Sequence, residues 1–351
     1  MTPRRKGLLG AIAALTAAAG VLHYADAPAL LAFCVAAAAL AGLAWVVSFA
    51  TEQVGERFGP SITGVLQSTL GNLPEFFVVL FALSSGEVVV AQFSIIGSIF
   101  ANALLVLGLV IFVGARRADD GVMRFSARLP NDTATLLLLA GFIIVLVGLS
   151  ARTHDEASDN IVAISAIASG LLLATYGVWV VGYIKAGPAP AGAAAHSEGM
   201  LPLRTAIVLL ALAGVGAALV SDWFVAALRP TIDQVGVSEQ FAGLVVVAIA
   251  GNAVENATGV VLAAKGQADL AISVVKNSVA QIAAFLFPAL VLVSLLFADR
   301  LTFDLAPLYV GALFLTTLSI WQVTGDGEAT SFEGAALMAT YVILAVFTLY
   351  E

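Results

Sequence analysis

Residues 71–75 read Gly-Asn-Leu-Pro-Glu, and 180 positions later residues 251–255 read Gly-Asn-Ala-Val-Glu. Each segment lies inside a long apolar stretch. The sequence that follows each segment is also related, because Ser-Ile-Ile-Gly-Ser-Ile-Phe-Ala-Asn at 94–102 aligns with Ser-Val-Val-Lys-Asn-Ser-Val-Ala-Gln at 273–281. Similarity at a nearly constant offset indicates that two parts of the chain share one structure.

The composition around these segments is that of a membrane protein. Of the 351 residues, 61% are hydrophobic and only 11% are charged, whereas a soluble domain has about 25% charged residues. The net charge of −8, with no basic run, excludes a nucleic-acid-binding surface. One cysteine, Cys34, excludes a disulfide framework and a thiolate metal cluster.

Apolar runs long enough to cross about 30 Å of hydrocarbon as helices recur along the whole chain. The first follows a basic start and resembles a signal peptide, but no clear cleavage site follows it and a second apolar run begins near Ala27, so we expect a retained helix. The sequence therefore predicts an all-α polytopic membrane protein. Eleven transmembrane helices are expected, at about 7–23, 28–50, 60–84, 88–114, 132–150, 159–184, 203–228, 238–264, 269–298, 304–322 and 332–350.

The positions of Lys and Arg predict the orientation. With the N-terminus in the cytoplasm, eleven of the 15 basic residues fall on the cytoplasmic side, three fall outside, and Lys276 lies within a span. Basic residues are enriched in cytoplasmic loops. We therefore expect a cytoplasmic N-terminus and an external C-terminus, in the inner membrane of a bacterial cell.

The repeat and the helix count together predict the domain organisation. We expect one extra helix at 1–26, a first five-helix repeat at 27–185, a hinge loop at 186–202 and a second five-helix repeat at 203–351. An odd number of helices in each repeat makes the second copy enter the membrane from the opposite side. Such a 1 + (5+5) inverted repeat is typical of secondary transporters, whose substrate site lies near the bilayer midplane between the repeats.

Two acidic residues, Glu75 and Glu255, lie deep inside apolar spans, where an ionised carboxylate costs at least about 2.5 kcal/mol. Gly71 and Pro74 loosen one helix and Gly251 loosens the other, which frees backbone carbonyl groups. Carboxylates with carbonyl oxygens are the ligands that Ca²⁺ prefers. Without metal, facing carboxylates repel each other and gain proton affinity. Both glutamates are therefore candidate metal ligands and proton carriers; alternatively, each one simply hydrogen-bonds a neighbouring helix.

Neutral polar residues on the same four helices extend this candidate site. Any one of them alone would be an ordinary interhelical hydrogen bond, but their recurrence in both repeats favours a site lining. The three histidines fall at helix ends or in loops, so none is placed as an intramembrane proton relay. The lining candidates are Asn72, Asn252, Asn256, Ser98, Asn102, Asn277, Ser278 and Gln281.

At these residues the chain resembles the cation/proton exchanger family, within the superfamily of calcium/cation antiporters. The resemblance covers nearly the whole chain and includes 71–83, 251–258, 97–109 and Ser278 with 281–288. It implies Ca²⁺/H⁺ antiport by alternating access, with both glutamates as ligands and proton carriers. It also implies a transporter that is not an enzyme and has no cofactor, since Ca²⁺ and H⁺ are transported.

The chain departs from the family pattern at two positions. Asn256 stands where the family usually has His, and Lys276 stands where it usually has a small residue. A lysine facing the glutamates would add positive charge and disfavour Ca²⁺. The alternative, which we favour, is that its long stem reaches the cytoplasmic surface. The hinge also lacks the acidic cluster that family members often carry.

Three other functions remain as alternatives to Ca²⁺/H⁺ exchange. A sodium-coupled exchanger (Na⁺/Ca²⁺ or Na⁺/H⁺) would use the same cavity. An intramembrane enzyme would need a nucleophile with a base, or a metal triad, inside the spans, and the sequence has neither. A scaffold protein would not explain two buried glutamates. The expected partners are a small cation, protons and the lipid bilayer, and a homo-oligomer is compatible with the sequence.

Overall fold

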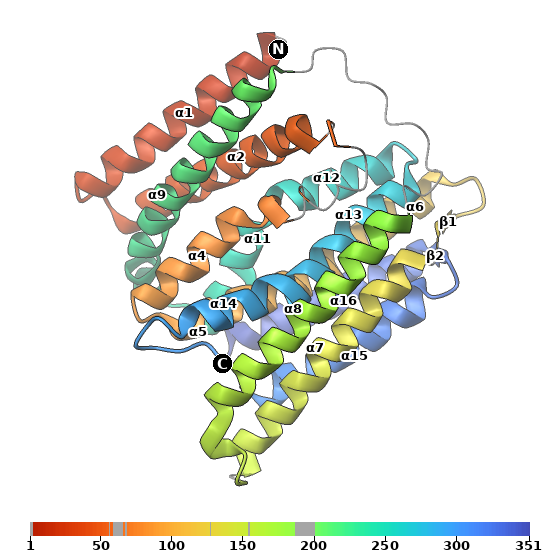
Figure 1. Cartoon of the computed structure of the whole chain (residues 1–351). Coiled ribbons are helices and arrows are strands. Elements are labelled where there is room, and N and C mark those ends of the chain that lie inside the picture. Colours follow the sequence, from red (N-terminus) through yellow and green to blue (C-terminus); the bar gives the residue numbers. More distant parts are fainter. Residues whose placement is uncertain are drawn as a thin grey trace.

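The computed structural model describes residues 3–55, 57–58, 66, 69–126, 128–153, 155–186 and 201–351, without the side chains of 128–131, 133, 183, 186 and 255. Most of this part of the chain is helical, and the helices lie side by side in a bundle (Figure 1). The helices are α1 (Pro3–Tyr24), α2 (Ala29–Gly55), α4 (Leu73–Ser84), α5 (Val88–Phe100), η1 (Ala101–Val106), α6 (Leu107–Arg117), α7 (Arg128–Thr153), η2 (Ser158–Asn160), α8 (Ile161–Ala186), α9 (Leu203–Val235), α10 (Glu239–Phe241), η3 (Ala242–Val247), α11 (Ala248–Gly251), α12 (Ala253–Ala264), α13 (Ala268–Gln281), η4 (Ile282–Leu286), α14 (Phe287–Ser294), α15 (Pro307–Thr324) and α16 (Ser331–Leu349).

Nine helices within the described residues are long and apolar enough to cross a membrane, and the bent pair at 239–251 and 256–264 makes a tenth candidate. The chain is therefore an all-α polytopic membrane protein. The remaining predicted span, 60–84, is described only at residue 66 and from residue 69 onward, so the count of eleven stays a prediction. The expected hinge at 186–202 also falls almost wholly outside the described residues.

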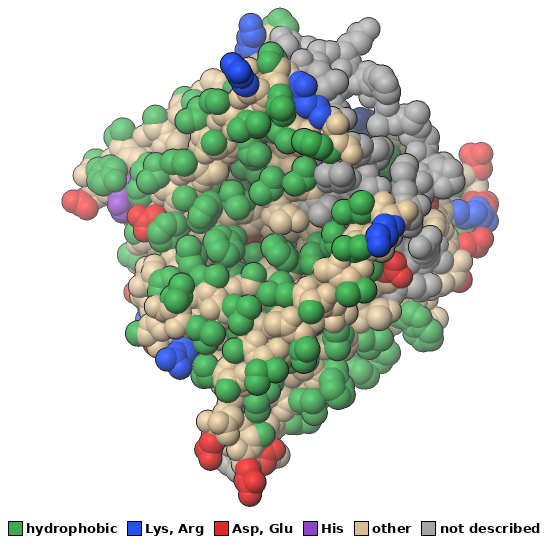
Figure 2. Space-filling view, in the orientation of Figure 1, with side chains coloured by type: hydrophobic (Ala, Val, Ile, Leu, Met, Phe, Trp, Pro, Cys, Tyr) green, Lys and Arg blue, Asp and Glu red, His purple; other side chains and the backbone are tan. Residues whose placement is uncertain are grey.

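The outer surface of the bundle is apolar. On α8, for example, Ile167, Leu171 and Val178 are 66%, 63% and 75% exposed. Figure 2 shows apolar side chains spread across one face, with charged groups gathered toward its edges. Water would not stabilise so large an apolar surface, so these side chains face lipid.

Glycines bring several helices into backbone contact. A Cβ atom added to Gly97 on α5 would lie 2.3 Å from the carbonyl oxygen of Leu244 in η3. On α6 and α16, Gly108 and Gly334 approach each other so closely that a Cβ on either would lie 2.6 Å from the other's carbonyl oxygen. Such close approaches hold membrane helices together by van der Waals contact.

A short two-stranded sheet, absent from the all-α prediction, joins two loops at one end of the bundle. Strand β1 (Val122–Arg124) pairs antiparallel with β2 (Glu328–Thr330), so that Arg124 lies opposite Glu328. The Arg124 guanidinium also bonds Asp120 at 2.7 Å and holds the pKa of that carboxyl below its usual value. The sheet ties the α6–α7 loop to the α15–α16 loop. Three residues in each strand are too few for a sequence pattern to indicate them.

Candidate ion site

Both glutamate motifs interrupt a helix, and each interruption falls on the asparagine. Asn72 has φ −80° and ψ 5°, and Asn252 has φ −106° and ψ 11°, near the sparsely populated bridge region. A new helix begins at the next residue in each case, α4 at Leu73 and α12 at Ala253. Pro74 lies in the first turn of α4, where its missing N–H needs no partner. The two motifs therefore have the same local structure.

Glu75 occupies the third position of α4 and its side chain is 3% exposed. A carboxylate is favoured there by the positive end of the helix dipole. A Cβ atom added to Gly251 would lie 3.7 Å from Cβ of Glu75, so the first glutamate packs against the break in the second motif. Glu255 occupies the third position of α12, and its side chain lies outside the described residues. If the two carboxyl groups share one Ca²⁺, they should approach within about 4–6 Å of each other, and this separation is a prediction.

The two asparagines at the breaks bond crosswise to the opposite half of the chain. Asn72 Nδ2 lies 3.5 Å from Oε1 of Gln281 on α13. Asn252 Nδ2 donates to Oγ of Ser98 on α5 at 2.8 Å. All four side chains are at most 3% exposed. The structure thus brings four of the predicted lining residues together in two matched pairs.

Two further groups attach to these pairs. Asn102 Nδ2 donates to the Ser98 carbonyl oxygen at 3.0 Å. Gln281 Nε2 donates to the hydroxyl of Tyr176 on α8 at 2.9 Å. Tyr176 is not among the predicted lining residues, although a phenol inside an apolar span is itself a signal, because a buried hydroxyl needs a hydrogen-bond partner.

The other predicted lining residues lie on α12 and α13. Ser278 is 2% exposed on α13. Asn256 Oδ1 and Asn277 Oδ1 are buried and accept no hydrogen bond within the described part of the chain. Buried acceptors are nearly always paired in folded proteins, so these two amide oxygens are available to a cation.

Lys276 does not reach the surface, and the expectation that it does is wrong. Its side chain is fully buried, and Nζ donates to Oγ1 of Thr324 on α15 at 3.0 Å. The Thr324 hydroxyl donates its own proton to the Ile320 carbonyl oxygen, which leaves its lone pairs for the ammonium. The lysine finds a polar partner inside the bundle, so its stem does not have to extend to water.

A wider π-helical segment lies within the long helix that follows each broken helix. Segment η1 begins at Ala101 and η4 begins at Ile282, positions 181 residues apart, close to the offset of the sequence repeat. Single π-helical turns inside α-helices occur frequently at functional sites. Among the described side chains no group of three or more His, Cys, Asp or Glu is gathered. A cation here would depend on amide, hydroxyl and carbonyl oxygens beside its carboxylates.

Comparisons with known proteins match the chain over almost its entire length. A family model described as "Sodium/calcium exchanger protein" matches residues 28–185 and 205–350. The "Ca(2+)/H(+) antiporter ChaA" of Bacillus subtilis is 31% identical, over 97% of both chains. The "Vacuolar calcium ion transporter" of Schizosaccharomyces pombe is 31% identical over 89% of this chain and 77% of its own. The solved "Structure of native YfkE" has a TM-score of 0.82 and 27% identity, covering 98% of this chain and all of the other.

Proposed function

Because the chain belongs to the sodium/calcium exchanger protein family, we propose that it exchanges Ca²⁺ for H⁺ across its membrane by alternating access. The observation that carries the proposal is the buried side chain of Glu75, whose Cβ and Cγ pack against the helix break at Gly251. A carboxylate buried in a transmembrane bundle is costly unless it binds an ion or a proton. Relatives named as Ca²⁺/H⁺ antiporters align with the chain over nearly its full length.

The same carboxylates serve both transported species in this proposal. Glu75 and Glu255 hold one Ca²⁺, and in its absence they hold protons, because two nearby carboxylates cannot both stay ionised cheaply. The amides of Asn72, Asn252 and Asn256 supply neutral oxygens at the helix breaks. Ion and protons then compete for one site, and this competition couples their movements in opposite directions.

Alternating access requires two halves that move relative to each other around the site. We propose that residues 27–185 and 203–351 are those halves, inverted in the membrane, with 186–202 as the cytoplasmic hinge. The crosswise pairs Asn72–Gln281 and Asn252–Ser98 support this division, since each break is held by the opposite half. The N-terminus is cytoplasmic in this arrangement.

Ion flux into proteoliposomes tests the proposal. Ca²⁺ uptake driven by a pH gradient is expected, and an imposed Na⁺ or K⁺ gradient should drive none. Exchange driven by Na⁺ in the absence of a pH gradient would favour the sodium-coupled alternative.

Glutamine variants test the site itself. E75Q and E255Q are each expected to abolish exchange, because each removes one of the two shared charges while keeping the side-chain shape. E156Q, the same change in an exposed loop, is the matched control. Exchange at the control's rate in either site variant would overturn the assignment of the glutamates.

A further inference from the structure

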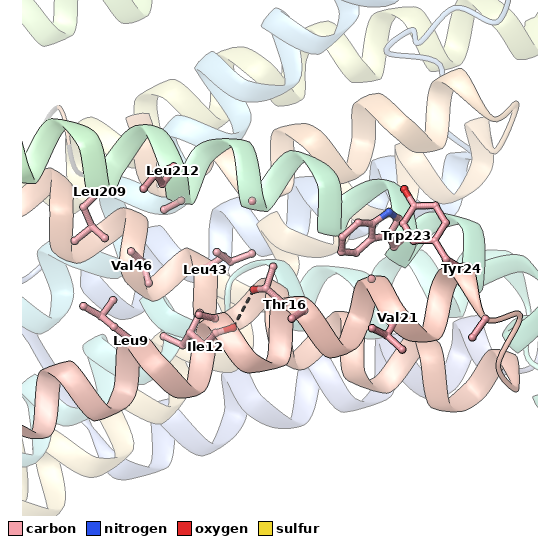
Figure 3. A pocket seen from close by; sticks show the side chains of 16 residues that line it. Leu9, Ile12, Thr16, Val21, Tyr24, Leu43, Val46, Leu209, Leu212 and Trp223 are labelled. Atoms are coloured by element: carbon pink, nitrogen blue, oxygen red, sulfur yellow. Dashed lines mark hydrogen bonds between the residues drawn. The ribbon is translucent and has the colours of Figure 1, made fainter.

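Helices α1, α2 and α9 enclose an elongated groove of about 860 Å³ (Figure 3). Its walls are apolar along most of their length, with Leu9 and Ile12 from α1, Leu43 and Val46 from α2, and Leu209 and Leu212 from α9. The hydroxyl of Thr16, in the middle of the groove, donates to the Ile12 carbonyl oxygen within α1. Along the middle of the groove a polar solute would therefore meet only the lone pairs of this one hydroxyl.

The groove lies beside close contacts that α1 makes with α2 and α9. Ile12, Ala19 and Gly20 are the buried residues of α1. A Cβ on Gly42 of α2 would lie 2.9 Å from Ile12 Cγ1, and a Cβ on Gly20 would lie 2.9 Å from Trp223 Cη2 on α9. Between these contacts the helices stand apart. Water is not stable in an apolar space of this kind, so hydrocarbon must fill it.

The groove runs along most of α1. From Leu9 to Tyr24 it follows sixteen residues of that helix, a rise of about 22 Å at 1.5 Å per residue. Acyl chains can lie along a groove of this length, and its apolar walls match their hydrocarbon.

The two ends of the groove carry opposite charge. At the Leu9 end, Arg4 and Lys6 on α1 and Arg204 in the first turn of α9 are exposed. Arg5 lies over the ring of Phe49 at 5.0 Å. The described acidic side chain at this end of α2 is Glu52. The basic side chains outnumber it.

The Tyr24 end is aromatic and acidic. His23 and Trp223 stack with ring centroids 6.0 Å apart, and Tyr24 packs against both rings. Asp26 and Asp222 are exposed beside them. Aromatic side chains of this kind lie at the membrane interface, and the carboxylates would repel an anionic headgroup. An anionic lipid in the groove would therefore place its headgroup at the basic end.

We propose that this groove is a binding site for an anionic glycerophospholipid. Its acyl chains lie between α1, α2 and α9, and its phosphate lies among Arg4, Lys6 and Arg204. In the orientation proposed above the lipid comes from the cytoplasmic leaflet, whose anionic lipids attract basic clusters. The bound lipid fills the apolar space between the three helices.

Titration of the purified full-length protein with phosphatidylglycerol or phosphatidylcholine, read by native mass spectrometry, tests the headgroup contact. Wild type is expected to bind phosphatidylglycerol at least tenfold more tightly, a difference of about 1.4 kcal/mol. The triple variant R4Q/K6Q/R204Q should lose this preference. R116Q/R117Q/K265Q, which removes the same charge from exposed positions at the end of α6 and just after α12, should keep it. Equal affinity for both lipids in wild type, or retained preference in the first variant, would overturn the proposal.

A matched pair of substitutions on α1 tests the acyl-chain contact. Ala17 lines the groove, whereas Ala18 is equally exposed and lies outside it. A17F should fill the groove and reduce phosphatidylglycerol binding at least tenfold, and A18F should bind as wild type does. Equal loss in both variants would refute a lipid in the groove. In a C34S background, an A17C protein that forms disulfide-linked dimers in membranes would show that a second copy covers the groove instead. None of these measurements depends on transport, so the lipid proposal can fail without affecting the exchange proposal, and the reverse also holds.

Discussion

The contact between Lys276 and Thr324 can be tested by removing each partner in turn. Nζ of Lys276 lies 3.0 Å from the threonine oxygen, and both side chains are fully buried. T324V keeps the shape of the side chain and removes the acceptor. A buried hydrogen bond to a charged group is worth about 1.5–3 kcal/mol, so we expect T324V to destabilise the protein by that amount. T317V is the matched control, because the buried Thr317 on the same helix donates to a backbone group of its own helix, the Leu313 carbonyl.

Unfolding in mixed micelles, followed by tryptophan fluorescence, would measure these free energies. In a K276M background T324V should cost much less, so the double-mutant cycle is expected to give a coupling energy of about 1 kcal/mol or more. Additivity within about 0.5 kcal/mol would refute the contact. Because Nζ of Lys276 bonds Thr324 on α15, we expect K276M and K276G to leave Ca²⁺ affinity within tenfold of wild type. A tenfold gain, about 1.4 kcal/mol, would instead show that the lysine acts on the ion site.

Two further predictions concern the packing between the halves. G97V places side-chain carbons where the Leu244 backbone now lies, 2.3 Å from a Cβ position, so the melting temperature should fall sharply. G141A, at a glycine with open space around it, should melt as wild type does. Similar melting temperatures for both variants would refute the close crossing. S98A removes the acceptor of Asn252 Nδ2, and the loss of about 1 kcal/mol should weaken Ca²⁺ binding several-fold in a calorimetric titration. An unchanged dissociation constant in S98A would show that this amide does not shape the site.

The sequence predicts the class of fold because a bilayer leaves few solutions for a spanning chain. Long apolar runs must be helices there, and the nine long helices among the described residues lie close to predicted ranges, for example Val88–Arg117 against 88–114. The breaks at Asn72 and Asn252 lie beside Gly71, Pro74 and Gly251, the residues predicted to loosen these two helices. Local chemistry is sufficient for features of this kind.

Partners across helices are not encoded in the local sequence, so they could not be predicted from it. Nothing near Lys276 in the sequence indicates that Thr324, 48 residues later, offers it a hydroxyl. Tyr176 meets Gln281 across 105 residues for the same reason. The β1–β2 sheet depends on two loops that meet only after the bundle has assembled. Such contacts require knowledge of which helix faces are adjacent.

The crosswise asparagine bonds have a consequence for the speed and reversibility of the transport cycle. If the halves separate to open one side, the contacts Asn72–Gln281 and Asn252–Ser98 are strained together, so the two breaks rearrange as a unit. Neutral hydrogen bonds of this kind contribute only about 1 kcal/mol each after exchange with water. The barrier that they add is therefore small compared with the cost of leaving a bare carboxylate in the membrane. The ion or proton bound to the carboxylates, more than the polar contacts around them, would decide when the site opens to the other side of the membrane.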